Sequence, residues 1–89
     1  MIYVDEAIYP FRGRMWCHLF TDDADVEKLH RFAQAIGLKR AWFQDRPGFP
    51  HYDLSPSRRM MAVRNGAKEV AAKQMVAIVQ AARDAAAKG

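Results

Sequence analysis

The chain has 89 residues, of which 51% are hydrophobic and 27% are charged, and its formal net charge is +4. This length suits one small domain with a single core, and the apolar content argues against disorder. No apolar run approaches the roughly 20 residues of a membrane span. The N-terminus lacks the basic segment of a signal peptide, and one cysteine excludes an internal disulfide framework. We therefore expect a cytoplasmic protein.

Two strands are expected near the N-terminus. Residues 2–4 alternate between two faces, and residues 15–20 are apolar on both faces apart from His18. A strand that is apolar on both faces is usually central in its sheet. The connection at residues 7–14 contains Pro and Gly, which interrupt regular structure.

The first helix is expected at residues 23–36, where apolar residues recur at helical spacing. Asp22 is the predicted N-cap, and Gly37 follows the last helical residue, where glycine favours termination. His30 lies beside an arginine on this helix and is expected at the surface.

A short strand is expected at residues 41–44, followed by a loop at residues 45–50 because of its Pro and Gly content. The second helix is expected at residues 56–65, with Ser55 as N-cap and proline at the first helical position. Its apolar residues are expected to face the core: Met60, Met61 and Val63.

The last helix is expected at residues 72–87, which are rich in alanine. Its apolar face is Met75, Ile78, Val79, Ala82 and Ala86. Residues 68–70 form either a short strand or the start of this helix. A strand there would be parallel to a neighbour across the second helix. The chain is thus predicted to be a single α/β domain over residues 1–89, with a three- to four-stranded sheet packed against about three helices.

The basic charge is concentrated in residues 39–64, which carry six basic and two acidic side chains. Arg58 and Arg59 fall in the first turn of the second helix, where cations are disfavoured unless an anion lies nearby. Backbone N–H groups, Ser55 and Ser57 could complete a site for a phosphate or carboxylate. The alternative is that the arginines form ion pairs with acidic groups, Asp53 among them.

The candidate catalytic residues are His18, His51 and Asp53. His51 and Asp53 are two apart, so an extended backbone puts both side chains on one side. Asp5 could point to the same sheet edge as His18 and is a further ligand-binding candidate. The alternatives are a structural histidine in an apolar strand, a carboxylate in a turn, and an exposed His51 before a helix. His18, His51, Asp53 and Asp5 could supply metal ligands only if the fold brings distant segments together. No short-spaced metal-ligand motif is present, so we expect neither a metal nor another cofactor.

Aromatic residues lie among arginines in or near the expected loops: Tyr9, Phe11, Trp42 and Phe49 with Arg12, Arg14 and Arg46. Such a mixture can stack bases and bind phosphates. The alternative is that the rings anchor loops or the core.

Several segments together resemble the small bacterial and phage family labelled domain of unknown function 4031. They are residues 1–5, 15–18, 36–38, 42–44, 51–54, 57–59 and 66–67. The resemblance covers about residues 1 to 70 and implies no assigned activity. It places the recurring positions of that family at Asp5, His18, His51, Asp53, Arg58 and Arg59.

Three functions remain open. The chain could bind a phosphate-bearing ligand, such as a nucleotide or nucleic acid, at Ser55–Arg59. It could hydrolyse or transfer a phosphate ester, with His18 and His51 as acid and base and Asp53 orienting His51. It could also be an interaction protein that associates with a partner or a second copy through its C-terminal helix. No membrane partner is expected.

Overall fold

The computed structural model describes residues 1–46 and 48–88, and in them it places six strands and three α-helices. The strands are β1 (Ile2–Val4), β2 (Tyr9–Phe11), β3 (Arg14–Thr21), β4 (Gln44–Arg46), β5 (Phe49–Leu54) and β6 (Lys68–Glu69). The helices are α1 (Glu27–Ala35), α2 (Pro56–Arg64) and α3 (Ala72–Lys88), with a 3-10 turn over Arg40–Trp42. Pro47, in the predicted loop, lies outside the described residues, as do the side chains of Ala86 and Lys88.

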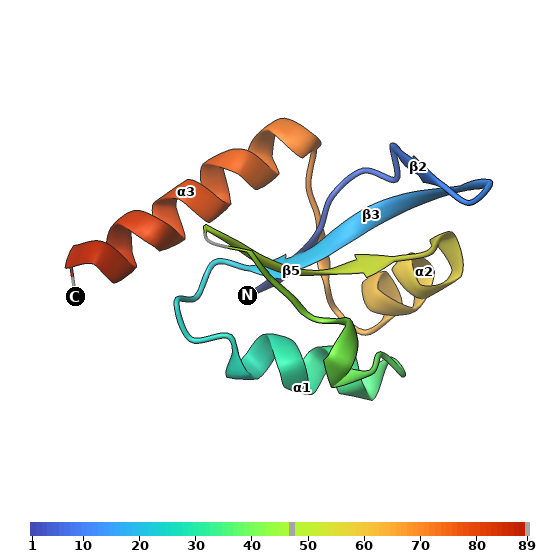
Figure 1. Cartoon of the computed structure of the whole chain (residues 1–89), viewed down its shortest axis with the longest axis horizontal. Coiled ribbons are helices and arrows are strands. Elements are labelled where there is room, and N and C mark those ends of the chain that lie inside the picture. The colour runs from blue at the N-terminus through green and yellow to red at the C-terminus, as the bar shows by residue number, and fades with distance from the viewer. Residues whose placement is uncertain (47, 89) are drawn as a thin grey trace.

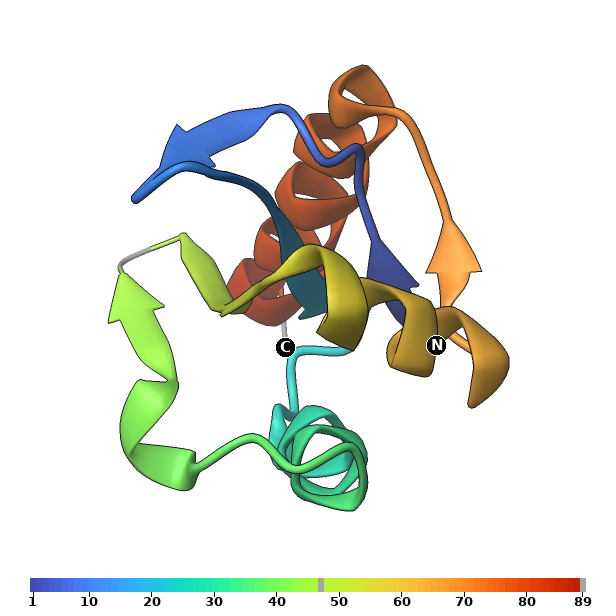
Figure 2. The same ribbon diagram turned by 90° about the vertical axis from the view of Figure 1, so that its right-hand side faces the viewer.

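The strands form one sheet in the order β4-β5-β3-β1-β6, with β2 paired to β3 as a hairpin. Strand β3 is central, as predicted, and runs antiparallel to β1 and β5. The strand left open at residues 68–70 is present as β6, and it is parallel to β1. Figure 1 shows α3 on one side of the sheet and α1 and α2 toward the other, and Figure 2 gives the same arrangement from the end.

Each face of the sheet has its own core. On the first face, Cys17 and Leu19 of β3 and Tyr52 and Leu54 of β5 are buried against α1 and α2. On the second face, Tyr3, Phe20 and Val70 are buried, and Met75, Ile78 and Val79 of α3 pack against them. This second core covers one end of its face, and the candidate site occupies the same face farther along β3 and β5.

The ends of the helices follow the predicted chemistry. The Ser55 hydroxyl accepts a hydrogen bond from the Arg58 N–H at 3.5 Å, and proline begins α2. Gly37 has a φ of +85°, and the Leu38 N–H donates to the Ala33 carbonyl at 2.9 Å. That is the Schellman pattern expected when glycine follows a helix.

The number of strands was underestimated, since six are present in the described residues rather than three or four. The main error concerns β5, because residues 45–50 were predicted to be a loop. Pro50 lacks an N–H, yet it pairs with Asp45 of β4. The pairing of β5 with β3 covers Tyr52–Leu54, so Pro50 lies in the part of β5 that has one neighbouring strand, where a missing donor is tolerated. The strand predicted at residues 41–44 was wrong except at Gln44, because the 3-10 turn includes Ala41 and Trp42 and β4 begins only at Gln44.

The first helix starts at Glu27 rather than at residue 23. Asp22 does not cap it, because its carboxylate accepts hydrogen bonds from the N-terminal ammonium at 2.8 Å and from the Tyr3 hydroxyl at 2.9 Å. His30 is buried rather than exposed, with Nδ1 2.7 Å from the Tyr52 hydroxyl.

The second helix presents a different face to the core from the one predicted. Ala62 is fully buried and Val63 packs against the first core, whereas Met60 and Met61 are exposed. The small Ala62 side chain allows α2 to lie close to the sheet. The two methionines therefore point away from it.

Candidate functional site

The Asp5 carboxylate orients His18. Asp5 follows β1, continues its pairing with β3 and is fully buried. One carboxylate oxygen accepts the His18 backbone N–H at 2.6 Å, and the other lies 2.8 Å from Nδ1 of the His18 ring. The Tyr9 hydroxyl donates to the second oxygen at 3.2 Å, and burial, followed by the Asp5 charge, raises the Tyr9 pKa. With Asp5 as the acceptor, a neutral His18 ring has its proton on Nδ1 and its lone pair on Nε2.

His51 is oriented in the same way by a backbone group. Its Nδ1 is 2.8 Å from the carbonyl oxygen of Phe49. Because a carbonyl can only accept, Nδ1 carries a proton, and in the neutral ring the lone pair is on Nε2. Nε2 of His51 lies 3.4 Å from Oδ1 of Asp53.

The two imidazoles converge on Asp53. His18 pairs with Asp53 in the β3–β5 register, and its Nε2 is 3.9 Å from the same Oδ1 atom. The ring centroids of His18 and His51 are 5.0 Å apart. His51 lowers the pKa of Asp53, burial opposes this shift, and the Gln44 amide, which donates to the carboxylate, adds to it. The fold therefore brings together the three residues that the sequence suggested as catalytic.

Aromatic rings hold both imidazoles in place. Phe49 stacks on His51 with centroids 4.2 Å apart and meets the His18 ring edge-on at 5.0 Å. Tyr9 covers His18 from another side at 4.3 Å. Asp53 remains 42% exposed, so the cluster is accessible from its carboxylate side.

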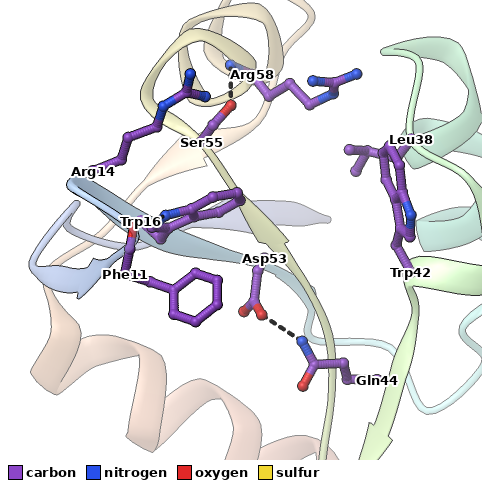
Figure 3. A pocket seen from close by; sticks show the side chains of 9 residues that line it. All are labelled: Phe11, Arg14, Trp16, Leu38, Trp42, Gln44, Asp53, Ser55 and Arg58. Carbon is purple, nitrogen blue, oxygen red and sulfur yellow. Dashed lines mark hydrogen bonds between the residues drawn. The ribbon is translucent and has the colours of Figure 1, made fainter.

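Asp53 also lines a pocket of about 430 Å³, shown in Figure 3. Phe11 and Trp16 stand on one side of the opening, and Leu38 and Trp42 stand on the other. The remaining lining residues are polar: Arg14, Gln44, Asp53, Ser55 and Arg58. The pocket thus combines flat apolar walls with two cationic side chains, and it borders the histidine cluster.

Arg58 reaches from the start of α2 toward the aromatic wall of this pocket. Its guanidinium carbon lies 5.5 Å from the Trp42 ring centroid, and Lys39 approaches the same ring at 5.6 Å. Among the described residues, Nε of Arg58 is a buried side-chain nitrogen without a hydrogen-bond partner. Leaving such a donor unpaired costs roughly 1–3 kcal/mol, which an acceptor from a ligand would offset.

The other predicted ligand-binding residues are placed differently. Arg59 donates to the Asp5 carbonyl at 3.0 Å and to Glu69 at 3.0 Å, so it links α2 to β1 and β6. The Asp5 carboxylate is engaged with His18 and Tyr9. Ser57 is exposed, and its hydroxyl lies 3.3 Å from that of Ser55. Arg59, Asp5 and Ser57 do not line the pocket.

Sequence reasoning missed Trp16, Leu38 and Gln44. Trp16 could have been found, because it lies two residues before His18 on a strand and therefore shares its face. Gln44 approaches Asp53 only through the pairing of β4 with β5, whose register was not predicted. Phe11, Arg14 and Trp42 were noted as part of the aromatic–arginine mixture, and all three line the pocket.

Comparison with protein families gives one match. The profile of the family described as "Protein of unknown function (DUF4031)" matches residues 2–82. The chain belongs to this family. The matched range covers every residue of the histidine cluster and the pocket. It also extends well into α3, beyond the limit near residue 70 at which the resemblance was first drawn.

The chain is also similar to a curated protein, the uncharacterized protein YneQ of Bacillus subtilis (strain 168). The two are 45% identical over 31 residues, which is 35% of this chain and 31% of YneQ. The match therefore spans just under a third of that relative. No solved structure matches the chain.

Among the described residues, none of the helices has the length and apolar character needed to cross a membrane.

Proposed function

We propose that the chain binds a phosphate-bearing ligand with a flat ring, either a free nucleotide or one nucleotide of a single-stranded nucleic acid. The binding site is the pocket between Trp16 and Trp42. The observation that carries the proposal is the unpaired Nε of Arg58 beside these aromatic walls. A phosphate oxygen would supply the missing acceptor and neutralise the cation.

The size and composition of the pocket support this ligand class. Its volume of about 430 Å³ lies in the range of small-molecule sites. Exposed tryptophan and phenylalanine rings stack on bases of any sequence, because every base has a flat face. Arg14 supplies a second cation at the polar end of the pocket. The site shares Ser55 and Arg58 with the one expected from the sequence, and it adds the two tryptophans.

Binding can be measured by titrating the chain with nucleoside monophosphates and with a labelled oligothymidylate, in a chelator-containing buffer. Arg58→Ala should weaken binding by about tenfold or more, since a charge-assisted hydrogen bond is lost. Arg64→Ala is the matched control, because it removes an exposed arginine from the same helix outside this pocket. Equal affinities for these two variants would refute the proposal.

The salt dependence separates the two forms of the ligand. An oligonucleotide that contacts several arginines should lose affinity steeply with added salt, and Arg58→Ala should reduce that slope by about one. A site for free nucleotides should instead bind the monophosphates as tightly as the oligonucleotide.

A second candidate function is hydrolysis of a phosphate ester, and the meeting of His18 and His51 at Asp53 favours it. Two imidazoles this close could act as general acid and base on an ester bound in the adjoining pocket. Turnover of a phosphodiester panel tests the idea. Full activity in the His18→Ala, His51→Ala double variant would exclude these residues from the chemistry.

Association with a partner or a second copy through α3 stays a prediction.

A further inference from the structure

We propose that His18, His51 and Asp53 bind one divalent transition-metal ion such as Zn²⁺. The ligand atoms are Nε2 of each histidine and a carboxylate oxygen of Asp53. The proposal deepens the function proposed above, because Asp53 also lines the pocket. Metal binding itself requires no nucleotide and can be measured separately.

The hydrogen bonds around the cluster leave its metal-ligating atoms free. In the neutral rings, Nδ1–H of His18 donates a hydrogen bond to Asp5, and Nδ1–H of His51 donates one to the Phe49 carbonyl. Histidines that bind metals nearly always donate their second ring N–H to a carboxylate or a backbone carbonyl. Both kinds of partner are present here, and both Nε2 atoms lie within 3.9 Å of Oδ1 of Asp53.

The spacing of the three atoms fits one ion. They lie within 4.8 Å of one another, with 3.4 Å from His51 and 3.9 Å from His18 to the shared carboxylate oxygen. Metal–ligand bonds of about 2.0–2.2 Å in tetrahedral geometry put neighbouring ligand atoms about 3.3–3.6 Å apart. The distance of 3.4 Å from His51 to Asp53 meets this requirement. An inward movement of the His18 ring would bring its Nε2 to the same spacing from Asp53 and from His51.

The choice of donors identifies the class of metal. Two imidazole nitrogens favour zinc, iron, copper or nickel over magnesium and calcium, which prefer oxygen ligands. Three protein ligands leave a coordination position open, as in catalytic zinc sites. The exposed Asp53 carboxylate lies at the edge of the pocket. The open position would therefore accept water or a phosphate oxygen of the bound ligand.

The sequence argued against a metal only because the candidate ligands are far apart along the chain. The pairing of β3 with β5 removes that premise, because it sets His18 opposite Asp53. His51 follows on the same face of β5, two residues earlier.

The test is calorimetric titration of chelator-treated, full-length protein with Zn²⁺ alone, and with Mg²⁺ as the comparison ion. The expected result is one Zn²⁺ per chain and no measurable binding of Mg²⁺. His51→Ala and Asp53→Asn should each weaken Zn²⁺ binding by about tenfold or more, since each removes a direct ligand. Asp45→Asn, a change of the same kind at another exposed carboxylate, should leave it unchanged.

A second measurement guards against loss of fold in the His51 variant. Nitrogen NMR of the imidazoles should show that Zn²⁺ shifts Nε2 of both His18 and His51 while each Nδ1 keeps its proton. Equal Zn²⁺ affinity of Asp53→Asn and Asp45→Asn, or no binding by the unaltered chain at millimolar Zn²⁺, would overturn the metal site. Neither result would bear on nucleotide binding in chelator.

Discussion

Asp5→Asn is expected to weaken metal binding although Asp5 does not touch the metal. In the unaltered chain, one Asp5 oxygen accepts the His18 backbone N–H at 2.6 Å and the other accepts the Nδ1 proton at 2.8 Å. The oxygen of an asparagine at position 5 must accept the His18 backbone N–H, because the opposite orientation would place the asparagine N–H₂ against that N–H. Its amide N–H₂ then faces Nδ1 of the ring. His18 would have to accept at Nδ1 and carry its proton on Nε2, where it cannot bind a metal.

The expected loss follows from this change of tautomer. Replacement of a carboxylate that orients a metal-bound histidine costs about 10- to 100-fold in metal affinity, or roughly 1.4–2.7 kcal/mol. Tyr9→Phe is the matched control. It removes the third hydrogen bond to the same carboxylate, at 3.2 Å, and leaves the tautomer of His18 unchanged. This variant should therefore bind Zn²⁺ within about threefold of the original affinity.

Two measurements check the prediction. Zinc titration gives the affinity, and long-range proton–nitrogen NMR of the imidazoles reports which His18 nitrogen carries the proton. If Asp5→Asn keeps the proton on Nδ1, or binds Zn²⁺ as tightly as Tyr9→Phe does, the argument from Asp5 is wrong.

The remaining predictions concern stability and reactivity. Burial, and then the Arg40 charge, lower the pKa of His30 in the folded chain, so protonation favours unfolding. Stability should fall as the pH drops below about 6.5, and urea unfolding at several pH values should show a weaker fall for His30→Asn. Burial raises the pKa of Cys17 to about 12, so its thiol should react with a disulfide reagent at pH 8 only when urea unfolds the chain. Leu19→Ala should cost about 2–5 kcal/mol in urea unfolding, whereas Met60→Ala, on the exposed face of α2, should cost less than about 0.5 kcal/mol.

Local chemistry predicted part of the fold well. The Ser55–Pro56 start of α2 and the Gly37 end of α1 follow from backbone preferences that act over a few residues. The apolar character of both faces of β3, apart from His18, correctly indicated a central strand. The start of strand β5 was missed because Gly48 and Pro50 favour a loop. The residues that follow do alternate, with Tyr52 and Leu54 in the core and His51 and Asp53 on the other face.

The histidine cluster was predictable in its members and not in its geometry. The two-residue spacing of His51 and Asp53 correctly put them on one side, and Asp5 was expected near His18. The distance between His18 and His51 depended on the register of β3 with β5, which involves contacts more than 30 residues apart in sequence. The orientation of Arg59 depended on β6, whose existence was left open.

The histidine cluster and the first core use the same strands in alternate positions. Cys17 and Leu19 face one way, and His18, between them, faces the other. A deletion of one residue in β3 would exchange these roles, placing an imidazole in the core and a leucine beside Asp53. Substitutions, by contrast, can alter one face and leave its neighbour intact. Point substitutions at His18, His51 and Asp53 could therefore change the side chains of the cluster without disturbing the core. Insertions and deletions within β3 or β5 would disrupt both.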